Sequence, residues 1–223
     1  MQFFQDWGNF LAAFVVFFLS HSIPVRPPVK SRIVAKIGAR GFALGYSALS
    51  IAILTWIIVA AGRAPYIELW SYQPWQNYAP LYGMLAAIVI ISMAFGQPNP
   101  LSFGGWNNDR FDPENPGIIG WVRHPLLIAL FIWSAAHMVP NGNLAHVIVF
   151  GLFGGFALLG RKIIDKRSKR LLGLEKWQHL SNTKRQIRIT ARGLKRIGIG
   201  VLIYLAVLYS HEIVIGVTPF IWD

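Results

Sequence analysis

Long apolar runs separated by polar stretches dominate the chain. Six runs are long enough to form membrane helices: 7–25, 42–61, 80–96, 121–140, 144–160 and 197–217. At about 1.5 Å of rise per residue, helices of this length cross, or nearly cross, about 30 Å of hydrocarbon. The pattern therefore predicts an all-α integral membrane protein, a polytopic bundle of about six transmembrane helices formed by one domain, residues 1–223.

The connections between these runs differ in character. Segment 63–79 is rich in Tyr and Trp, which is typical of chain lying along the membrane boundary. Segment 97–120 is interrupted by prolines, so it predicts an ordered loop rather than a regular helix. Segment 161–180 alternates basic clusters with apolar residues, which favours a helix that leaves the membrane and then lies on its surface.

Composition supports the membrane assignment and restricts the chemistry. Apolar residues make up 54% of the chain and charged residues 13%, too little polar surface for a soluble domain. The chain has no cysteine, which excludes disulfides, thiolate metal ligands and thiol nucleophiles. Histidine, carboxylates, hydroxyls and arginine must therefore carry any chemistry.

The positive charge is concentrated beside the apolar runs. The net charge is +12, and 18 of the 21 Lys and Arg lie in segments 26–40 and 161–196. Because cytoplasmic loops carry an excess of basic residues, both segments are expected on the cytoplasmic side, and both termini on the periplasmic side. We interpret the charge as contacts with anionic lipid headgroups, and expect no nucleic-acid partner.

Histidines within apolar runs are the leading functional candidates, because a titratable ring in hydrocarbon is costly. The predicted topology places His21 and His124 at an inner level, and His137, His146 and His211 at an outer level. His124 and His137 are 13 residues apart, about 20 Å along a helix, and their rings point roughly 140° apart. One site therefore cannot easily use both rings.

Short motifs recur along the chain in a specific order and spacing. They are His21-Ser22, Ile37-Gly38-Ala39-Arg40, Tyr46-Ser47, Phe111-Asp112-Pro113 with Pro116-Gly117, Arg123-His124-Pro125, Trp133-Ser134-Ala135-Ala136-His137 with Asn141-Gly142-Asn143, and Tyr209-Ser210-His211 with Gly216. With these motifs the chain resembles the NnrU family over essentially its whole length.

The resemblance implies a location and a cofactor. Bacterial NnrU proteins are associated with denitrification and nitric oxide metabolism, which implies the bacterial inner membrane. The related plant and cyanobacterial cis-zeta-carotene isomerases carry b-type haem and act in a redox-dependent way. By position, their haem-ligating histidines correspond to His21 and His137, which implies haem b and a small hydrophobic or gaseous substrate. Where the isomerases have a cysteine, this chain has Ser134, so a thiolate step does not transfer.

The choice of the second iron ligand stays open between two histidines. Two axial nitrogens, each about 2 Å from the metal, must lie at one membrane depth. The predicted topology separates His21 from His137 in depth, whereas His124 shares the level of His21. In that alternative, Arg123 would pair with a haem propionate, or else with a lipid phosphate.

Two other classes of function remain. Arg123-His124-Pro125 followed by Asp165 resembles the pattern of the isoprenylcysteine and phospholipid methyltransferases, membrane enzymes that use S-adenosylmethionine. A non-catalytic assembly subunit of a respiratory complex is the third possibility, so whether the protein is an enzyme stays open. The visible spectrum of the purified protein distinguishes the haem hypothesis from the other two.

Overall fold

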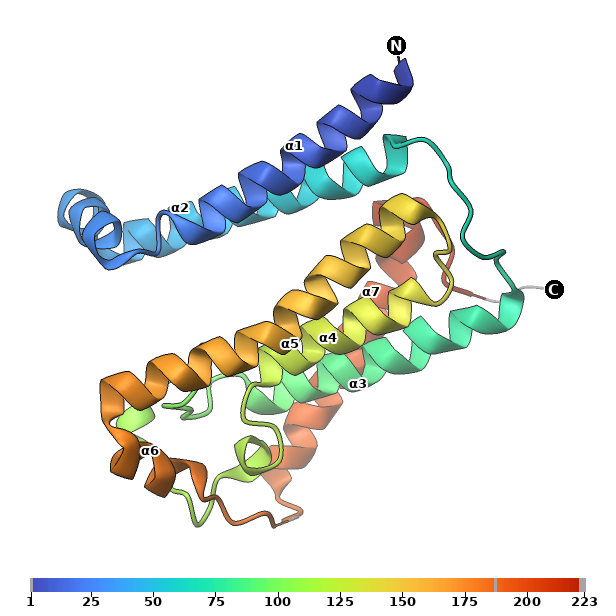
Figure 1. Cartoon of the computed structure of the whole chain (residues 1–223). Coiled ribbons are helices and arrows are strands. Elements are labelled where there is room, and N and C mark those ends of the chain that lie inside the picture. The colour runs from blue at the N-terminus through green and yellow to red at the C-terminus, as the bar shows by residue number, and fades with distance from the viewer. Residues whose placement is uncertain (1, 187, 221–223) are drawn as a thin grey trace. The chain divides into compact units, whose positions relative to one another are not determined.

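Helices carry nearly all of the regular structure in the computed structural model, which describes residues 2–186 and 188–220 (Figure 1). The α-helices are α1 Gln2–Ser22, α2 Pro27–Arg63, α3 Tyr78–Ala94, α4 Pro125–Met138, α5 Leu144–Leu172, α6 Leu174–Ser181 and α7 Ala191–Ile215. Short 3-10 helices are η1 Pro74–Asn77, η2 Asn108–Arg110 and η3 Gly117–Gly120. Within the described residues, β pairing is limited to an isolated bridge between Glu68 and Asn143. The predicted all-α class is confirmed.

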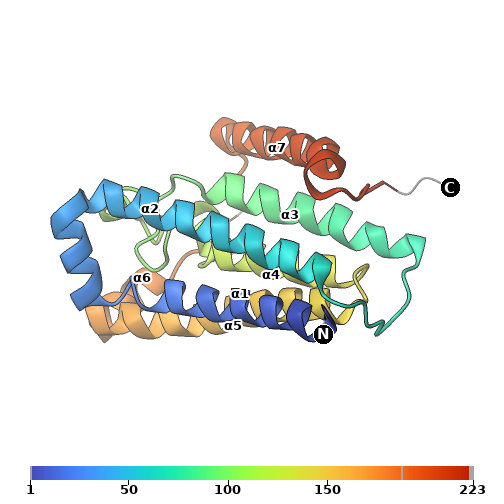
Figure 2. The ribbon, with the colours of Figure 1, turned by 90° about the horizontal axis from the view of Figure 1, so that it is seen from above.

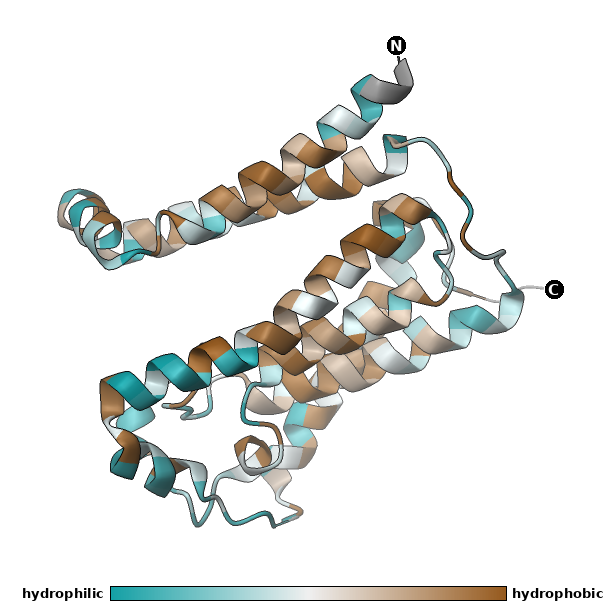
Figure 3. Ribbon diagram, in the orientation of Figure 1, coloured by the Kyte–Doolittle hydropathy of each residue, from teal (hydrophilic) through white to brown (hydrophobic). Residues whose placement is uncertain are grey.

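Among the described residues, four helical stretches are long and apolar enough to cross a membrane: Pro27–Arg63, Pro74–Ala94, Leu144–Leu172 and Ala191–Ile215. Helix α1 has 21 residues, and α4 is apolar but has 14, fewer than the roughly 20 that a full crossing needs. Hydrophobic residues fill the middle of the long helices, and hydrophilic residues gather on the second half of α5 (Figure 3). Large apolar side chains such as Leu44 and Leu202 are exposed, as expected of a surface that faces lipid.

The chain forms two compact units. The first comprises residues 1–70 and 143–149, and the second comprises residues 71–142 and 150–223. In the first unit, α1 packs against α2, and the Trp56 indole donates a hydrogen bond of 3.1 Å to the Asn9 amide oxygen. Helix α2 is kinked at Gly38, whose φ of 74° and ψ of 166° suit glycine alone, so its basic first part diverges from the apolar remainder.

In the second unit, α3 lies between α4 and α7, and α5 lies on the other side of α4 (Figure 2). Small residues lie at the α3–α4 and α3–α7 contacts. A Cβ atom on Gly83 of α3 would lie 2.7 Å from the Cβ of Ala136 on α4, and one on Gly200 of α7 would lie 3.0 Å from the Ser92 hydroxyl of α3. Such residues let membrane helices approach closely, because the packing force in lipid is contact between backbones and small side chains.

The proline-rich connection between α3 and α4 is an ordered loop, as predicted, with η2 and η3 as its helical turns. Buried Asn99 organises it. The backbone N–H of Asn99 donates to the Asn108 side-chain oxygen at 2.8 Å, and the Asn99 amide donates to the Arg123 carbonyl at 2.8 Å. A Cβ at Gly105 would lie 2.6 Å from the Asn99 carbonyl oxygen, so this close approach requires glycine.

Several helix bounds differ from the predicted apolar runs; α2, for example, begins at Pro27 rather than at residue 42. Helix α4 begins at Pro125 rather than at residue 121, because proline fits the first helical turn, where its missing N–H has no helical partner. Helix α5 runs on from the apolar run 144–160 to Leu172, because Lys, Arg and Leu are all good helix formers. Gly173, with φ 81°, separates α5 from α6, so the helical character predicted for segment 161–180 is confirmed.

Candidate functional site

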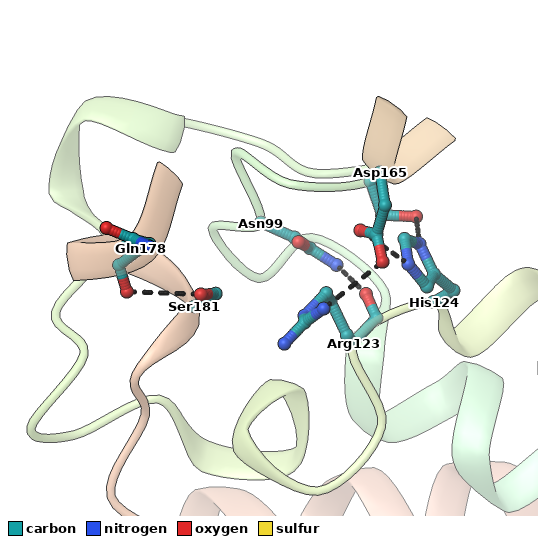
Figure 4. A network of polar contacts seen from close by, with 7 residues as sticks. Asn99, Arg123, His124, Asp165, Gln178 and Ser181 are labelled. Atoms are coloured by element: carbon teal, nitrogen blue, oxygen red, sulfur yellow. Dashed lines mark hydrogen bonds and ion pairs between the residues drawn. The ribbon is translucent and has the colours of Figure 1, made fainter. Parts of the chain in front are cut away.

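The chemically richest cluster lies at the basic end of the second unit, where the start of α4 meets the second half of α5 (Figure 4). The Arg123 guanidinium Nη1 lies 3.2 Å from Oδ2 of Asp165, and the His124 Nε2 lies 3.2 Å from Oδ1 of the same carboxylate. Asp165 therefore binds both residues of the Arg-His pair, one with each oxygen. The sequence separation of about 40 residues is bridged by the packing of α4 on α5.

His124 is buried and both of its ring nitrogens are engaged. Its Nδ1 lies 3.0 Å from the Ser102 hydroxyl, and 4% of the residue is exposed. Burial lowers the pKa of His124 below its usual value of about 6.5, and the positive charge of Arg123 acts in the same direction, while Asp165 opposes both. The ring is therefore neutral at pH 7, with Nε2–H donating to Asp165 and Nδ1 accepting from Ser102. The contact between His124 and Asp165 is a hydrogen bond rather than an ion pair.

Arg123 is held from two sides. Besides its ion pair with Asp165, its guanidinium carbon lies 5.1 Å from the centre of the Trp177 ring on α6. The same ring lies 4.2 Å from the Lys169 ammonium nitrogen. Cation–π contacts of this kind fix the plane of the guanidinium and retain its charge. Arg123 therefore presents a fixed positive charge at this end of the unit.

A pocket of about 510 Å³ opens beside this cluster. It is lined by Ile119, Gly120, Trp121, Val122, Arg123, His124, Ile128, Arg161, Asp165, Ser181, Asn182, Thr183 and Arg185. The segment after α6 forms one wall and is attached to the loop between α3 and α4. Its contacts include the Thr183 hydroxyl donating to the Gly120 carbonyl at 3.4 Å and the Lys184 N–H donating to the Pro113 carbonyl at 2.9 Å. The walls are thus drawn from three separate parts of the sequence.

His21 lies in the first unit, in the last turn of α1. Its Nδ1 lies 2.9 Å from the Phe17 carbonyl oxygen, and its ring is 4.2 Å from the Phe17 ring and 5.6 Å from the Tyr46 ring of α2. Two of the sequence motifs, His21-Ser22 and Tyr46-Ser47, are therefore in contact across the α1–α2 pair. No hydrogen bond to Nε2 of His21 occurs among the described residues.

His137 has the same local arrangement in the second unit. Its Nδ1 lies 2.9 Å from the Trp133 carbonyl oxygen, and its ring lies between the Trp133 and Phe150 rings at 5.6 and 5.7 Å. In the part of the chain that the structure describes, its Nε2 has no hydrogen-bond partner. The predicted separation of His124 and His137 to opposite ends of one helix is confirmed, because His124 precedes α4 and His137 lies in its last turn.

The histidine rings differ in whether they have a nitrogen free to bind the iron of b-type haem. Metal-ligating histidines typically donate one ring N–H to a carbonyl, which leaves the other nitrogen free for the metal. His21 and His137 both meet this requirement, with aromatic side chains around them that suit an apolar macrocycle. His124 does not, because neither of its ring nitrogens is free. Among the described residues, no group of three or more His, Asp or Glu side chains could hold a bare metal ion, so a porphyrin would have to supply the other ligands.

The cluster includes predicted residues and others that sequence reasoning missed. Arg123 and His124 both contact Asp165 in this cluster, whereas His21 and His137 are not part of it. Arg161 could have been found, because its spacing of four from Asp165 places both on one face of a helix. Ser102 and Arg185 gave no such signal, since each comes from a connection whose path depends on the whole unit.

Comparison with known families gives a match for nearly the whole chain. The model of the family described as NnrU protein matches residues 9–219. No match was found among curated proteins or among solved structures. The order of the motifs and the extent of this match lead to the same conclusion: the chain belongs to the NnrU family.

Proposed function

We propose that the protein binds b-type haem in the bacterial inner membrane, where His21 and His137 would hold the iron. The observation that carries this proposal is the shared anchoring of the two rings: each Nδ1 lies 2.9 Å from the carbonyl four residues earlier. This hydrogen bond fixes the tautomer, so that the lone pair of Nε2 is available to iron. The two histidines also belong to two separate motifs of the family.

The state of His124 supports His137 as the second ligand. Iron would have to displace either Ser102 or Asp165 from the His124 ring, which would leave a buried hydroxyl or carboxylate without its partner. His137 loses nothing by binding, because its free nitrogen has no partner to give up. The alternative that pairs His21 with His124 is therefore the less favourable one.

Haem iron would supply reversible one-electron chemistry, and it could bind a small gaseous molecule only where one of the two histidines is displaced. The residues of this chain would orient the two imidazoles and, through Trp133 and Phe150, exclude water from the His137 side. Ser134, which is 1% exposed, stands where the isomerases have a cysteine, which favours a role in nitrogen-oxide metabolism over isomerisation. We propose that this role belongs to denitrification.

The test is the visible spectrum of the detergent-purified protein expressed with haem available. We expect a b-type Soret band that His21→Ala and His137→Ala each weaken strongly, because a chain without cysteine cannot hold haem by thioether bonds. Addition of nitric oxide to the reduced protein should shift the band. His179→Ala, a change of an exposed ring on α6, should leave the spectrum as in the wild type.

Two outcomes contradict the proposal. Retention of the full Soret band in both His21→Ala and His137→Ala would remove the assigned ligands. Loss of the band in His211→Ala but not in His137→Ala would assign the second ligand to α7, where the His211 Nδ1 is likewise bonded to a carbonyl, that of Val217, at 2.8 Å.

One observation favours a second candidate function, methyl transfer from S-adenosylmethionine. Arg123 and His124 converge with Asp165 on one pocket, as the resemblance to membrane methyltransferases requires. The charge of the pocket opposes it, because three arginines face one carboxylate, and S-adenosylmethionine itself carries a net positive charge. A colourless protein that binds S-adenosylmethionine would favour this candidate over haem.

A further inference from the structure

The pocket beside Arg123 contains more positive charge than its acid can neutralise. Three guanidinium groups line it, those of Arg123, Arg161 and Arg185, together with the carboxylate of Asp165. The carboxylate pairs with Arg123 at 3.2 Å, and the described chain offers no acidic partner to Arg161 or Arg185. Because His124 is neutral, the lining carries a surplus of about two positive charges at pH 7.

The two arginines without an acidic partner among the described residues are exposed side chains attached to ordered backbone. Arg161 lies on the continuous helix α5, one turn before Asp165. Arg185 follows Lys184, whose N–H donates to the Pro113 carbonyl at 2.9 Å and whose ammonium pairs with Glu114 at 3.5 Å. The backbone at both arginines is therefore held in place, which limits the ordering that ligand binding requires to the two side chains.

The pocket is separate from the proposed haem ligands. His137 lies 13 residues beyond His124 on α4, which corresponds to about 20 Å along the helix. A group coordinated by His137 therefore does not reach Arg161 or Arg185 from the opposite end of the helix. The surplus charge calls for a different ligand.

We propose that this pocket binds a phosphoryl group. A phosphate monoester carries about 1.5 to 2 negative charges at pH 7, which matches the surplus, whereas one carboxylate would leave half of it unbalanced. Planar guanidinium groups bind phosphate oxygens in pairs, which is why arginine is preferred over lysine at such sites. At about 510 Å³, the pocket also has room, along Ile119, Trp121 and Val122, for an organic remainder.

The experiment measures binding of radiolabelled inorganic phosphate to the full chain in nanodiscs of zwitterionic phosphatidylcholine. The wild type should bind phosphate saturably. The double variant Arg161→Gln/Arg185→Gln should bind at least roughly tenfold more weakly, which corresponds to about 1.4 kcal/mol. The matched control is Arg167→Gln/Arg170→Gln, which removes the same two charges from exposed positions on α5 outside the pocket and should bind within roughly twofold of the wild type.

Asp165→Asn gives a test of opposite sign. This change removes one negative charge, so the net charge of the pocket rises by one and Arg123 loses its ion-pair partner. Phosphate should therefore bind several-fold more tightly. A site for a cation or for S-adenosylmethionine would instead be weakened by this change. Equal unfolding temperatures of the ligand-free variants and wild type would show that the comparison concerns binding and not folding.

Adding a phosphate-bearing lipid to the nanodiscs distinguishes a lipid headgroup from a soluble phosphate ester as the source of the phosphoryl group. If phosphatidic acid, a lipid with a phosphate monoester headgroup, displaces the labelled phosphate when it is added to the nanodiscs, the group belongs to a lipid headgroup. If the lipid has no effect, it belongs to a soluble phosphate ester; both results support the site. Absence of saturable binding in either membrane, or equal binding by the double variant and its control, overturns the proposal, and neither result depends on haem.

Discussion

At the scale of single residues, His124 shows how two neighbours decide the chemistry of a ring. A histidine before a membrane helix could bind metal, carry charge or accept a proton. Ser102 and Asp165 occupy both nitrogens of this ring, and burial keeps it neutral. The ring therefore connects the α3–α4 loop to α5, and its contribution is to the geometry of Arg123 and Asp165.

The depressed pKa of His124 predicts a pH dependence of stability. In the unfolded chain this ring gains a proton below about pH 6.5, while burial disfavours the same proton in the folded protein. The stabilising contribution is therefore present above pH 6.5 and is lost as the pH falls below it. His124→Gln should remove this dependence and, at pH 8, cost about 1–3 kcal/mol for the lost buried hydrogen bonds.

The measurement is thermal unfolding in detergent between pH 5 and pH 8, and the quantity of interest is the slope of the midpoint with pH. The variant should show a flatter slope than the wild type. His179→Gln, which changes an exposed ring, should keep the slope of the wild type. Equal slopes in wild type and His124→Gln would mean that other groups cause the pH dependence.

At the scale of helices, hydropathy predicts which segments are apolar but not where the helix ends. The positions of α3 and α7 were close to expectation because the apolar run and the helix nearly coincide. The basic part of α5 lies beyond the apolar run, and its helix was predicted from the alternation of basic and apolar residues, because polar residues end an apolar run without ending a helix. The site depends on this extension, since it carries Arg161 and Asp165 past the last apolar residues of the run.

Close helix contact in the second unit predicts an effect of adding one methyl group. Gly83→Ala should destabilise the protein by about 1–3 kcal/mol, because the new Cβ would overlap the Ala136 side chain of α4. Gly155→Ala is the matched control, a helical glycine of α5 with no atom within 4 Å of an added Cβ, and it should be neutral or stabilising. A comparison of unfolding midpoints checks both, and an unchanged midpoint in Gly83→Ala would contradict the packing described for α3 and α4.

A second element-scale prediction concerns the end of α3. The Arg196 guanidinium on α7 donates hydrogen bonds to the carbonyls of Ser92, Met93 and Phe95, which have no helical partners at a C-terminus. Arg196→Gln should therefore lower the unfolding midpoint, by about 1.5–3 kcal/mol in free energy for a charged donor. Arg192→Gln, one turn earlier and exposed, removes the same charge and should have little effect; equal losses would mean that charge alone matters.

At the scale of the whole molecule, the sequence predicts the fold class and the kinds of side chain available better than it predicts which residues contact one another in space. The apolar runs and the positions of histidines are local patterns, and each could be read directly. The meeting of Ser102, His124 and Asp165 depends on how a proline-rich loop folds back against two helices, which no local pattern encodes. Both Arg123 and His124 were sequence candidates for a haem site, and the structure shows that they line one pocket with Asp165.

The distribution of charge makes the last prediction, which concerns orientation in the membrane. The absence of cysteine allows single-cysteine variants without background. Lys30→Cys and Ser168→Cys, in the two basic segments, should react in intact cells with membrane-permeant reagents alone, because basic segments remain in the cytoplasm. Tyr72→Cys, in the aromatic segment before η1, should also react with impermeant reagents. Impermeant labelling of Ser168→Cys would invert this topology and move the phosphoryl-binding pocket to the periplasmic side, where anionic lipid attracts basic residues less strongly.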